Sequence, residues 1–138
     1  MYYDRITRRV HLEIGGEEYL LAFTLGGLEE LESKAGKSLI SIVTNASIPP
    51  IKVLLDGFAI ALRDGGNGHR YTKPEAEALA QDIIDESPEG MVGLANVFYA
   101  TIAASGLIGG KFRTQIFEQL GIEDKDGAPK NARTAKAK

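Results

Sequence analysis

The stretch Thr24-Leu-Gly-Gly-Leu-Glu-Glu-Leu-Glu-Ser-Lys-Ala-Gly36 decides much of the fold, because it predicts a helix with both ends marked. The Thr24 hydroxyl can accept hydrogen bonds from the first free N–H groups of the helix, and Gly36 can adopt the left-handed conformation that ends it. No side chain in this stretch is a reactive group, so it favours binding over catalysis. Four apolar residues recur at helical spacing along one face: Leu25, Leu28, Leu31 and Ala35.

A β-hairpin is predicted directly before this helix. Apolar and polar residues alternate over 10–14 and again over 19–23, which is the pattern of half-buried strands. Gly15-Gly16 permits the positive φ angles of a tight turn. An isolated hairpin is only marginally stable, so its apolar face is expected to pack on helices or on another subunit. A loop over residues 15–18 would place six apolar side chains on that face as the pairs Ile14–Tyr19, Leu12–Leu21 and Val10–Phe23.

The rest of the chain predicts further helices, whose ends are marked by capping residues, prolines and glycines. The segment 38–46 is short and fits either a helix or an extended piece. The fold class is therefore α+β and mostly α-helical, with an N-terminal β-hairpin followed by about four or five amphipathic helices. The clearer helices are one capped by Ser47 and closed near Gly65, one opened by the capping box Thr72–Glu75, one restarted at Ser87 and ended at Gly106, and a short one before Gly121.

Length and composition predict one globular domain over residues 1–120 of the 138. The chain has no cysteine, which excludes disulfides and thiolate metal sites, and no apolar run long enough to cross a membrane. Residues 121–138 carry five basic and three acidic side chains with almost no apolar content, so they are predicted to be a disordered basic tail. The remaining residues have a net charge of −5, which makes nucleic-acid binding by the globular part unlikely.

Two polar clusters are candidate sites, and for both a structural role is the favoured interpretation. The segment 65–70 could cradle a phosphate, but it lacks a P-loop ending and is better explained as a mobile connector. Asp82, Asp85 and Glu86 share a helix face, but a solvated acidic face explains them without a metal ion. No nucleophile–base pair is recognisable, so neither catalysis nor a cofactor is expected.

The apolar helix faces exceed what a small core needs, which suggests a groove for the helices of another protein. A well-filled core is the competing interpretation. The residues proposed to line the groove are Phe58, Leu62, Met91, Leu94 and Phe98.

The hairpin, the run Leu25–Glu32 and the segment Ala61-Leu-Arg-Asp-Gly-Gly66 together resemble the small tail assembly chaperones of siphophages and gene transfer agents. The resemblance covers roughly residues 8–105, and the chain departs from it after residue 106 and in its basic tail. It implies a non-enzymatic protein in the cytoplasm of a bacterial host. Such a protein keeps the tape measure protein soluble until tail tube subunits polymerise around it.

The resemblance leaves open contacts with the tail tube protein and with further copies of the chain. Two other functions remain as alternatives. One is a structural virion subunit, in the tail tube or a connector, whose hairpin adds to a neighbour's sheet edge. The other is a nucleic-acid-binding regulator that acts through its basic tail, which predicts strongly salt-dependent binding.

Overall fold

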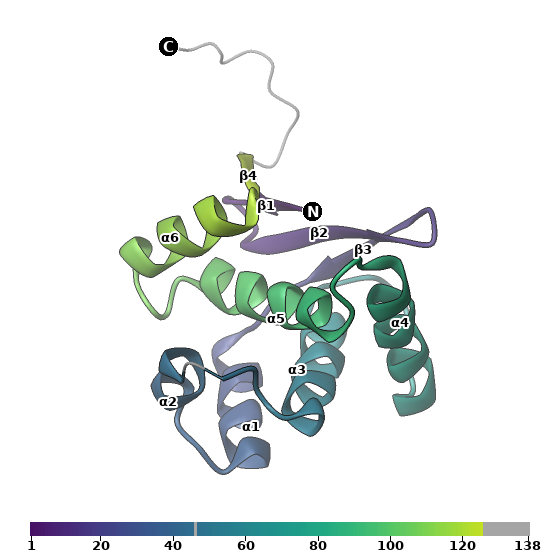
Figure 1. Cartoon of the computed structure of the whole chain (residues 1–138), viewed down its shortest axis with the longest axis horizontal. Coiled ribbons are helices and arrows are strands. Elements are labelled where there is room, and N and C mark those ends of the chain that lie inside the picture. Colours follow the sequence, from purple (N-terminus) through teal and green to yellow (C-terminus); the bar gives the residue numbers. More distant parts are fainter. Residues whose placement is uncertain (46, 126–138) are drawn as a thin grey trace.

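The computed structural model describes residues 1–45 and 47–125, which form a four-stranded sheet and six helices (Figure 1). This is the α+β, mostly helical fold that the sequence predicts. The strands are β1 (Tyr2–Asp4), β2 (Arg9–Ile14), β3 (Glu17–Leu21) and β4 (Glu123–Lys125), in the sheet order β3-β2-β1-β4. The helices are α1 (Leu25–Ala35), α2 (Leu39–Thr44), α3 (Ile51–Asp64), α4 (Lys73–Glu86), α5 (Met91–Ser105) and α6 (Gly110–Leu120).

The hairpin of β2 and β3 turns over two residues rather than four. Gly15 and Gly16 have φ angles of 59° and 85°, which suit a two-residue turn whose backbone twist matches the strands. The predicted pairing is therefore wrong by two residues. Because a shift by an even number of residues keeps every side chain on its face, the apolar face survives the change. The observed pairs on that face are Val10–Leu21, Leu12–Tyr19 and Ile14–Glu17.

Two strands that the sequence does not predict complete the sheet. β1 pairs antiparallel with β2, and β4 pairs parallel with β1. Tyr3 in β1 is 1% exposed, and its ring lies 4.8 Å from the ring of Phe117 in α6. These contacts join the N-terminal residues of the chain to its last helix.

The predicted start of the tail at residue 121 is wrong. Ile122 is buried in the core, and Glu123–Lys125 forms β4. One apolar side chain and the backbone pairing with β1 therefore order residues whose composition alone is polar. The rest of the predicted tail, 126–138, lies outside the described residues.

Most helix ends follow the local sequence. The Thr24 hydroxyl accepts a hydrogen bond from the Gly27 N–H, and Gly36 is left-handed. The capping box at Thr72 and Glu75 has both of its hydrogen bonds. The prediction that Ser47 caps a helix is wrong, because α3 begins only after Pro50, whose fixed φ leads directly into the first turn. The ambiguous segment after Ser38 is a short helix.

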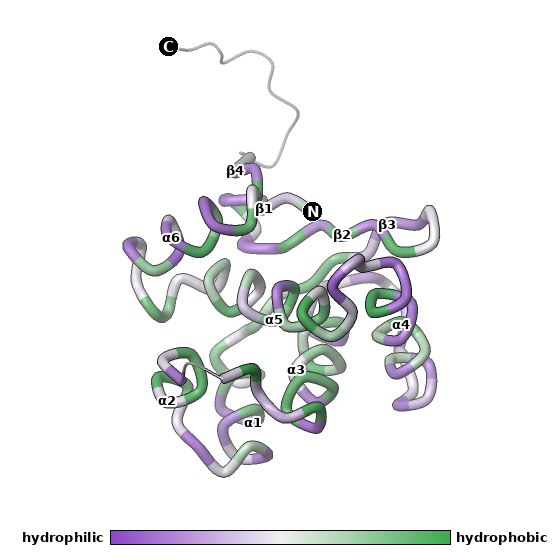
Figure 2. Tube along the Cα trace, viewed as in Figure 1, coloured by the Kyte–Doolittle hydropathy of each residue, from purple (hydrophilic) through white to green (hydrophobic). Residues whose placement is uncertain are grey.

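α5 is the central helix of the core. Its buried residues occupy every side of it, and a helix that is apolar all round has to lie inside the protein. Figure 1 shows it running beneath the sheet with α6 at one end and α4 at the other, and Figure 2 shows apolar residues along most of its length. In the described part of the chain, no helix combines the length and the apolar character needed to cross a membrane.

Candidate functional site

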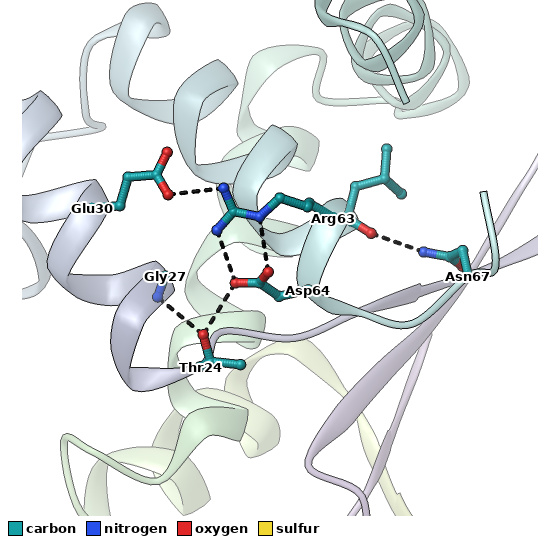
Figure 3. A network of polar contacts seen from close by, with 7 residues as sticks. Thr24, Gly27, Glu30, Arg63, Asp64 and Asn67 are labelled. Carbon is teal, nitrogen blue, oxygen red and sulfur yellow. Dashed lines mark hydrogen bonds and ion pairs between the residues drawn. The ribbon is translucent and has the colours of Figure 1, made fainter. Parts of the chain in front are cut away.

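Two of the three sequence segments on which the family resemblance rests, the run Leu25–Glu32 and the segment 61–66, meet at one polar cluster between α1 and α3 (Figure 3). Thr24 donates a hydrogen bond of 3.1 Å to the Asp64 carboxylate. Arg63 contacts the same carboxylate at 2.9 Å through Nε and reaches Glu30 on α1 at 2.8 Å through Nη1. We call Thr24, Gly27, Glu30, Arg63 and Asp64 the α1–α3 junction. Hydrogen bonds to Asp64 first, and then to Glu30, raise the pKa of Arg63 above its ordinary value.

Gly27 sets the distance between the two helices at this junction. A Cβ atom built on it would lie 2.5 Å from Asp64 Oδ2 and 3.0 Å from Ile60 Cγ2. Neighbouring Gly26 has nothing within 4 Å of the same position. The junction therefore needs glycine at residue 27 for packing, and its charged groups hold two helices together without forming a cavity for a ligand.

The glycine-rich segment 65–70, which follows α3, is attached to the sheet through Asn67. This differs from the mobile connector that the sequence predicts. The Asn67 side chain accepts a hydrogen bond from Leu20 N at 2.8 Å and donates to Leu20 O at 2.8 Å and to Leu62 O at 3.0 Å. A Cβ on Gly65 would collide with the Leu20 carbonyl oxygen, so this backbone approach also needs glycine. The segment thus occupies part of the outer edge of β3. Its only sequence signal was an asparagine between glycines.

The acidic residues of α4 also have local structural contacts. Glu86 Oε2 accepts a hydrogen bond of 3.0 Å from Gly15 N at the hairpin turn, and Asp85 accepts one of 2.9 Å from Gln81. His11 lies between the carboxylates of Asp4 and Glu18, at 4.0 and 3.3 Å. Across the described residues, no group of three or more His, Asp or Glu side chains could hold a metal ion.

The groove predicted for a partner is wrong as a surface. Phe58, Leu62, Leu94 and Phe98 are buried in the core, and only Met91 is exposed. Their helix faces turn inward because α3 and α5 pack on each other and on the sheet, with the rings of Phe23 and Phe98 meeting edge to face at 6.3 Å. The competing interpretation, a well-filled core, accounts for these four residues.

A different apolar surface lies around the connection between α2 and α3. Ile40, Ile48 and Ile51 are 57%, 45% and 44% exposed. Two open hollows, of about 250 and 240 Å³, lie against Ile48, and among the described residues Lys37 is the only charged one that lines either of them. We call these three isoleucines, of which Ile48 alone lines the hollows, together with the two hollows the Ile48 surface. The other apolar and aromatic residues that line the hollows are Ala35, Ile42, Val43, Pro49, Pro50, Val53, Tyr99, Phe112 and Ile116.

A third hollow, of about 290 Å³, lies between α1, α3 and the start of α4 and has a different character. Leu55 and Ala59 line it together with charged side chains of both signs. An apolar side chain of a partner would lie against these charges. The charged lining residues are Glu30, Lys34, Asp56, Arg63, Arg70, Lys73 and Glu77.

Comparisons of this chain with models of protein families, with curated proteins and with solved structures find no match. The functional argument therefore starts from the surfaces of the molecule. Of the hollows described above, those of the Ile48 surface are the ones suited to apolar side chains.

Proposed function

We propose that this protein is a tail assembly chaperone, which binds the tape measure protein in the bacterial cytoplasm and keeps it soluble during tail assembly. The observation that carries the proposal is the Ile48 surface, where apolar side chains are exposed and Lys37 is the one charged residue among the described residues that line its two hollows. Exposed apolar surface of this kind marks interaction sites, because leaving it in water costs free energy.

The geometry of the Ile48 surface suits the apolar face of a helix. An amphipathic helix presents large apolar side chains at i, i+3, i+4 and i+7, and such side chains dock into apolar hollows. Two hollows that share Ile48 in their lining can accept two anchors of this kind. Val43, Tyr99 and Phe112 are half-buried in the hollow walls and supply further apolar contact area.

The open form of both hollows suits a partner that is later released. A shallow site buries only part of each anchor, so binding to a single copy is expected to be weak. A long client with many apolar helical segments can still be retained by several copies, since each bound copy covers one segment. Weak contacts then allow tail tube subunits to displace the copies one by one.

The alternative of a tail tube or connector subunit has less support. In that alternative the hairpin adds to a neighbour's sheet through the outer edge of β3. Leu20 N and O already bond to Asn67, and the N–H of Ala22 donates to Ala61 O at 3.1 Å. A neighbouring strand would have to displace these internal bonds.

Co-expression with a tape measure protein tests the proposal. We expect the soluble fraction of the tape measure protein to rise, and several copies of the chaperone to be recovered with each client by pull-down and light scattering. A protein that leaves the client insoluble and is not recovered with it would contradict the proposal. Assembly of the protein alone into closed rings would favour the structural subunit.

A further inference from the structure

The turn between β1 and β2 places an arginine in an unusual backbone conformation. Arg8 has a φ angle of 59°, and in the part of the chain that the structure describes no other residue except glycine has a positive φ. This left-handed region suits glycine, asparagine or aspartate, because other side chains crowd the backbone there. Asparagine or glycine would form the same turn with less strain, so the arginine side chain itself is expected to have a role.

Arg8 and Arg9 both line an open hollow of about 420 Å³ between this turn, the start of α1 and the end of α5. One N–H group of Arg8 donates a hydrogen bond of 3.1 Å to the carbonyl oxygen of Ser105. A guanidinium group has five N–H donors, so this bond leaves others for a ligand. Neither arginine forms an ion pair with another described residue.

Two glycines make room for the guanidinium groups. A Cβ atom built on Gly66 would lie 2.9 Å from Arg9 Nη2, and one built on Gly106 would lie 3.3 Å from Arg8 Nη1. Both distances are shorter than ordinary van der Waals contact, so each guanidinium group lies close against a glycine backbone. Side chains that already lie against the protein lose less conformational freedom when a ligand binds them.

Asp64 lines the same hollow, but its carboxylate is already bound. Its Oδ1 accepts a hydrogen bond of 2.9 Å from Arg63 Nε. Its Oδ2 accepts hydrogen bonds of 3.2 Å from Arg63 Nη2 and 3.1 Å from Thr24 Oγ1. Among the described residues that line the hollow, Arg8 and Arg9 are therefore the charged residues without an ion pair.

Exposed apolar side chains accompany the two arginines. Leu25 and Leu107 line the hollow and are 71% and 47% exposed, and buried Ala22 and Phe23 line it as well. An apolar side chain of a partner that covers the two leucines would remove this apolar surface from water, which is favourable. The hollow thus combines unpaired positive charge with apolar surface.

We propose that this hollow binds an acidic and apolar segment of another protein, in which a Glu or Asp carboxylate contacts the two arginines and a large apolar side chain packs on the two leucines. Arginine suits this contact because its fork of N–H donors matches the geometry of a carboxylate. Nucleic acid is a poorer ligand, because the chain has a net charge of −3 and a polyanion would also meet its carboxylates.

The inference goes beyond the proposed function and does not depend on it. Among the described residues, none lines both this hollow and a hollow of the Ile48 surface. A protein with such a segment can therefore bind here while a client occupies the Ile48 surface.

Nuclear magnetic resonance titration of the full chain, labelled with ¹⁵N, tests the proposal. The probes are the peptide Ser-Glu-Leu-Glu-Leu-Ser and its uncharged counterpart Ser-Gln-Leu-Gln-Leu-Ser, each with both ends blocked. We expect the acidic peptide to shift the amide signals of residues that line the hollow. It should bind at least about tenfold more tightly than the uncharged peptide, because hydrogen bonds to a charged group are the stronger ones. Salt at about 500 mM should weaken its binding.

The variant Arg8→Asn/Arg9→Gln should lower the affinity for the acidic peptide at least about tenfold, because both guanidinium groups are lost while asparagine keeps the turn. Lys34→Gln is the matched control, since it removes a positive charge from α1 outside the hollow and should leave binding unchanged. If circular dichroism shows that the double variant is unfolded, Arg9→Gln alone leaves the turn intact and should still lower the affinity.

Equal binding of the two peptides, or no binding of either at millimolar concentration, would overturn the proposal. So would wild-type affinity in a destabilised Arg8→Asn/Arg9→Gln, because Arg8 would then serve only to bond Ser105. Binding that is lost on replacing Lys130, Arg133 and Lys136 by Gln would also contradict it. Tighter binding of a thymidine oligonucleotide of the same net charge at the hollow would favour nucleic acid and overturn it as well.

Discussion

The α1–α3 junction and the Ile48 surface differ in how much their sequences reveal. The junction is built from short, recognisable runs of residues, and each of its polar groups has a partner inside the protein. The Ile48 surface is built from isoleucines, two prolines and two aromatic residues. These residues come from α2, the α2–α3 connection, α3, α5 and α6, and no single run of sequence marks the surface. Only the second region offers exposed apolar groups to another protein.

The difference separates residues that form a recognisable sequence pattern from residues that can bind a partner. Close packing restricts which residues a junction accepts, so a steric requirement such as that at Gly27 produces a readable pattern. An apolar docking surface accepts many combinations of apolar residues of similar total area. We therefore expect substitutions at the junction to change stability and those at the Ile48 surface to change binding.

The largest loss of stability is expected for Gly27→Val. The added side chain collides with Asp64 and Ile60, and overpacking of this kind costs about 1–3 kcal/mol in the free energy of unfolding. Urea denaturation measures the effect. Gly26→Val is the matched control, because it places the same side chain one residue away in open space and should change stability by less than about 0.5 kcal/mol. Equal losses for the two variants would contradict the packing role of Gly27.

Asn67→Ala should cost about 1–2 kcal/mol, because it leaves Leu20 N and O without their partner. Hydrogen exchange provides the specific measurement. The Leu20 amide should exchange faster in the variant because it loses its local partner. The amides in the middle of α5 should exchange faster only to the extent that the global stability of the protein falls. An unchanged Leu20 amide would show that Asn67 does not hold the edge of β3.

Arg63→Gln should have a smaller effect, below about 1 kcal/mol, even though Arg63 contacts two carboxylates. The Arg63 side chain is half exposed, and solvent and salt screen such pairs. Chemical denaturation at low and high salt measures this, and the difference between variant and wild type should shrink at high salt. A loss of stability that exceeds the loss for Gly27→Val and does not change with salt would contradict this. It would mean that the contacts of Arg63 stabilise the junction more than the packing at Gly27 does.

Ile48→Asp should change stability least, by less than about 0.5 kcal/mol, because Ile48 is already 45% exposed. Thermal denaturation checks this. A strongly destabilised variant would mean that Ile48 belongs to the core, and the contrast with the junction would then disappear.

Much of the fold follows from local sequence, and the errors have physical causes. The ends of α1 and the capping box of α4 depend on neighbouring residues, so the sequence predicts them. β1 and β4 are three residues each, too short for a periodic pattern, and they exist through pairing between the two ends of the described chain. The register of the hairpin depended on whether the turn used two residues or four, which composition does not decide.

The candidate site could not be predicted because burial is a property of the whole fold. Phe58 and Phe98 have the spacing of either a groove or a core, and only the packing of α3 against α5 decides between them. Ile48 lies between prolines and polar residues, where no helical or strand pattern gives it a face. Its exposure follows from the path of the chain between α2 and α3.

The most direct test of the account is capture of a tape measure protein by Ile48→Asp/Ile51→Asp beside the control Ile6→Asp, which introduces the same charge at an exposed isoleucine elsewhere. With all proteins folded by circular dichroism, we predict that Ile48→Asp/Ile51→Asp loses client solubilisation and that Ile6→Asp keeps it. Full client solubilisation by Ile48→Asp/Ile51→Asp would contradict the central claim that the Ile48 surface binds the client.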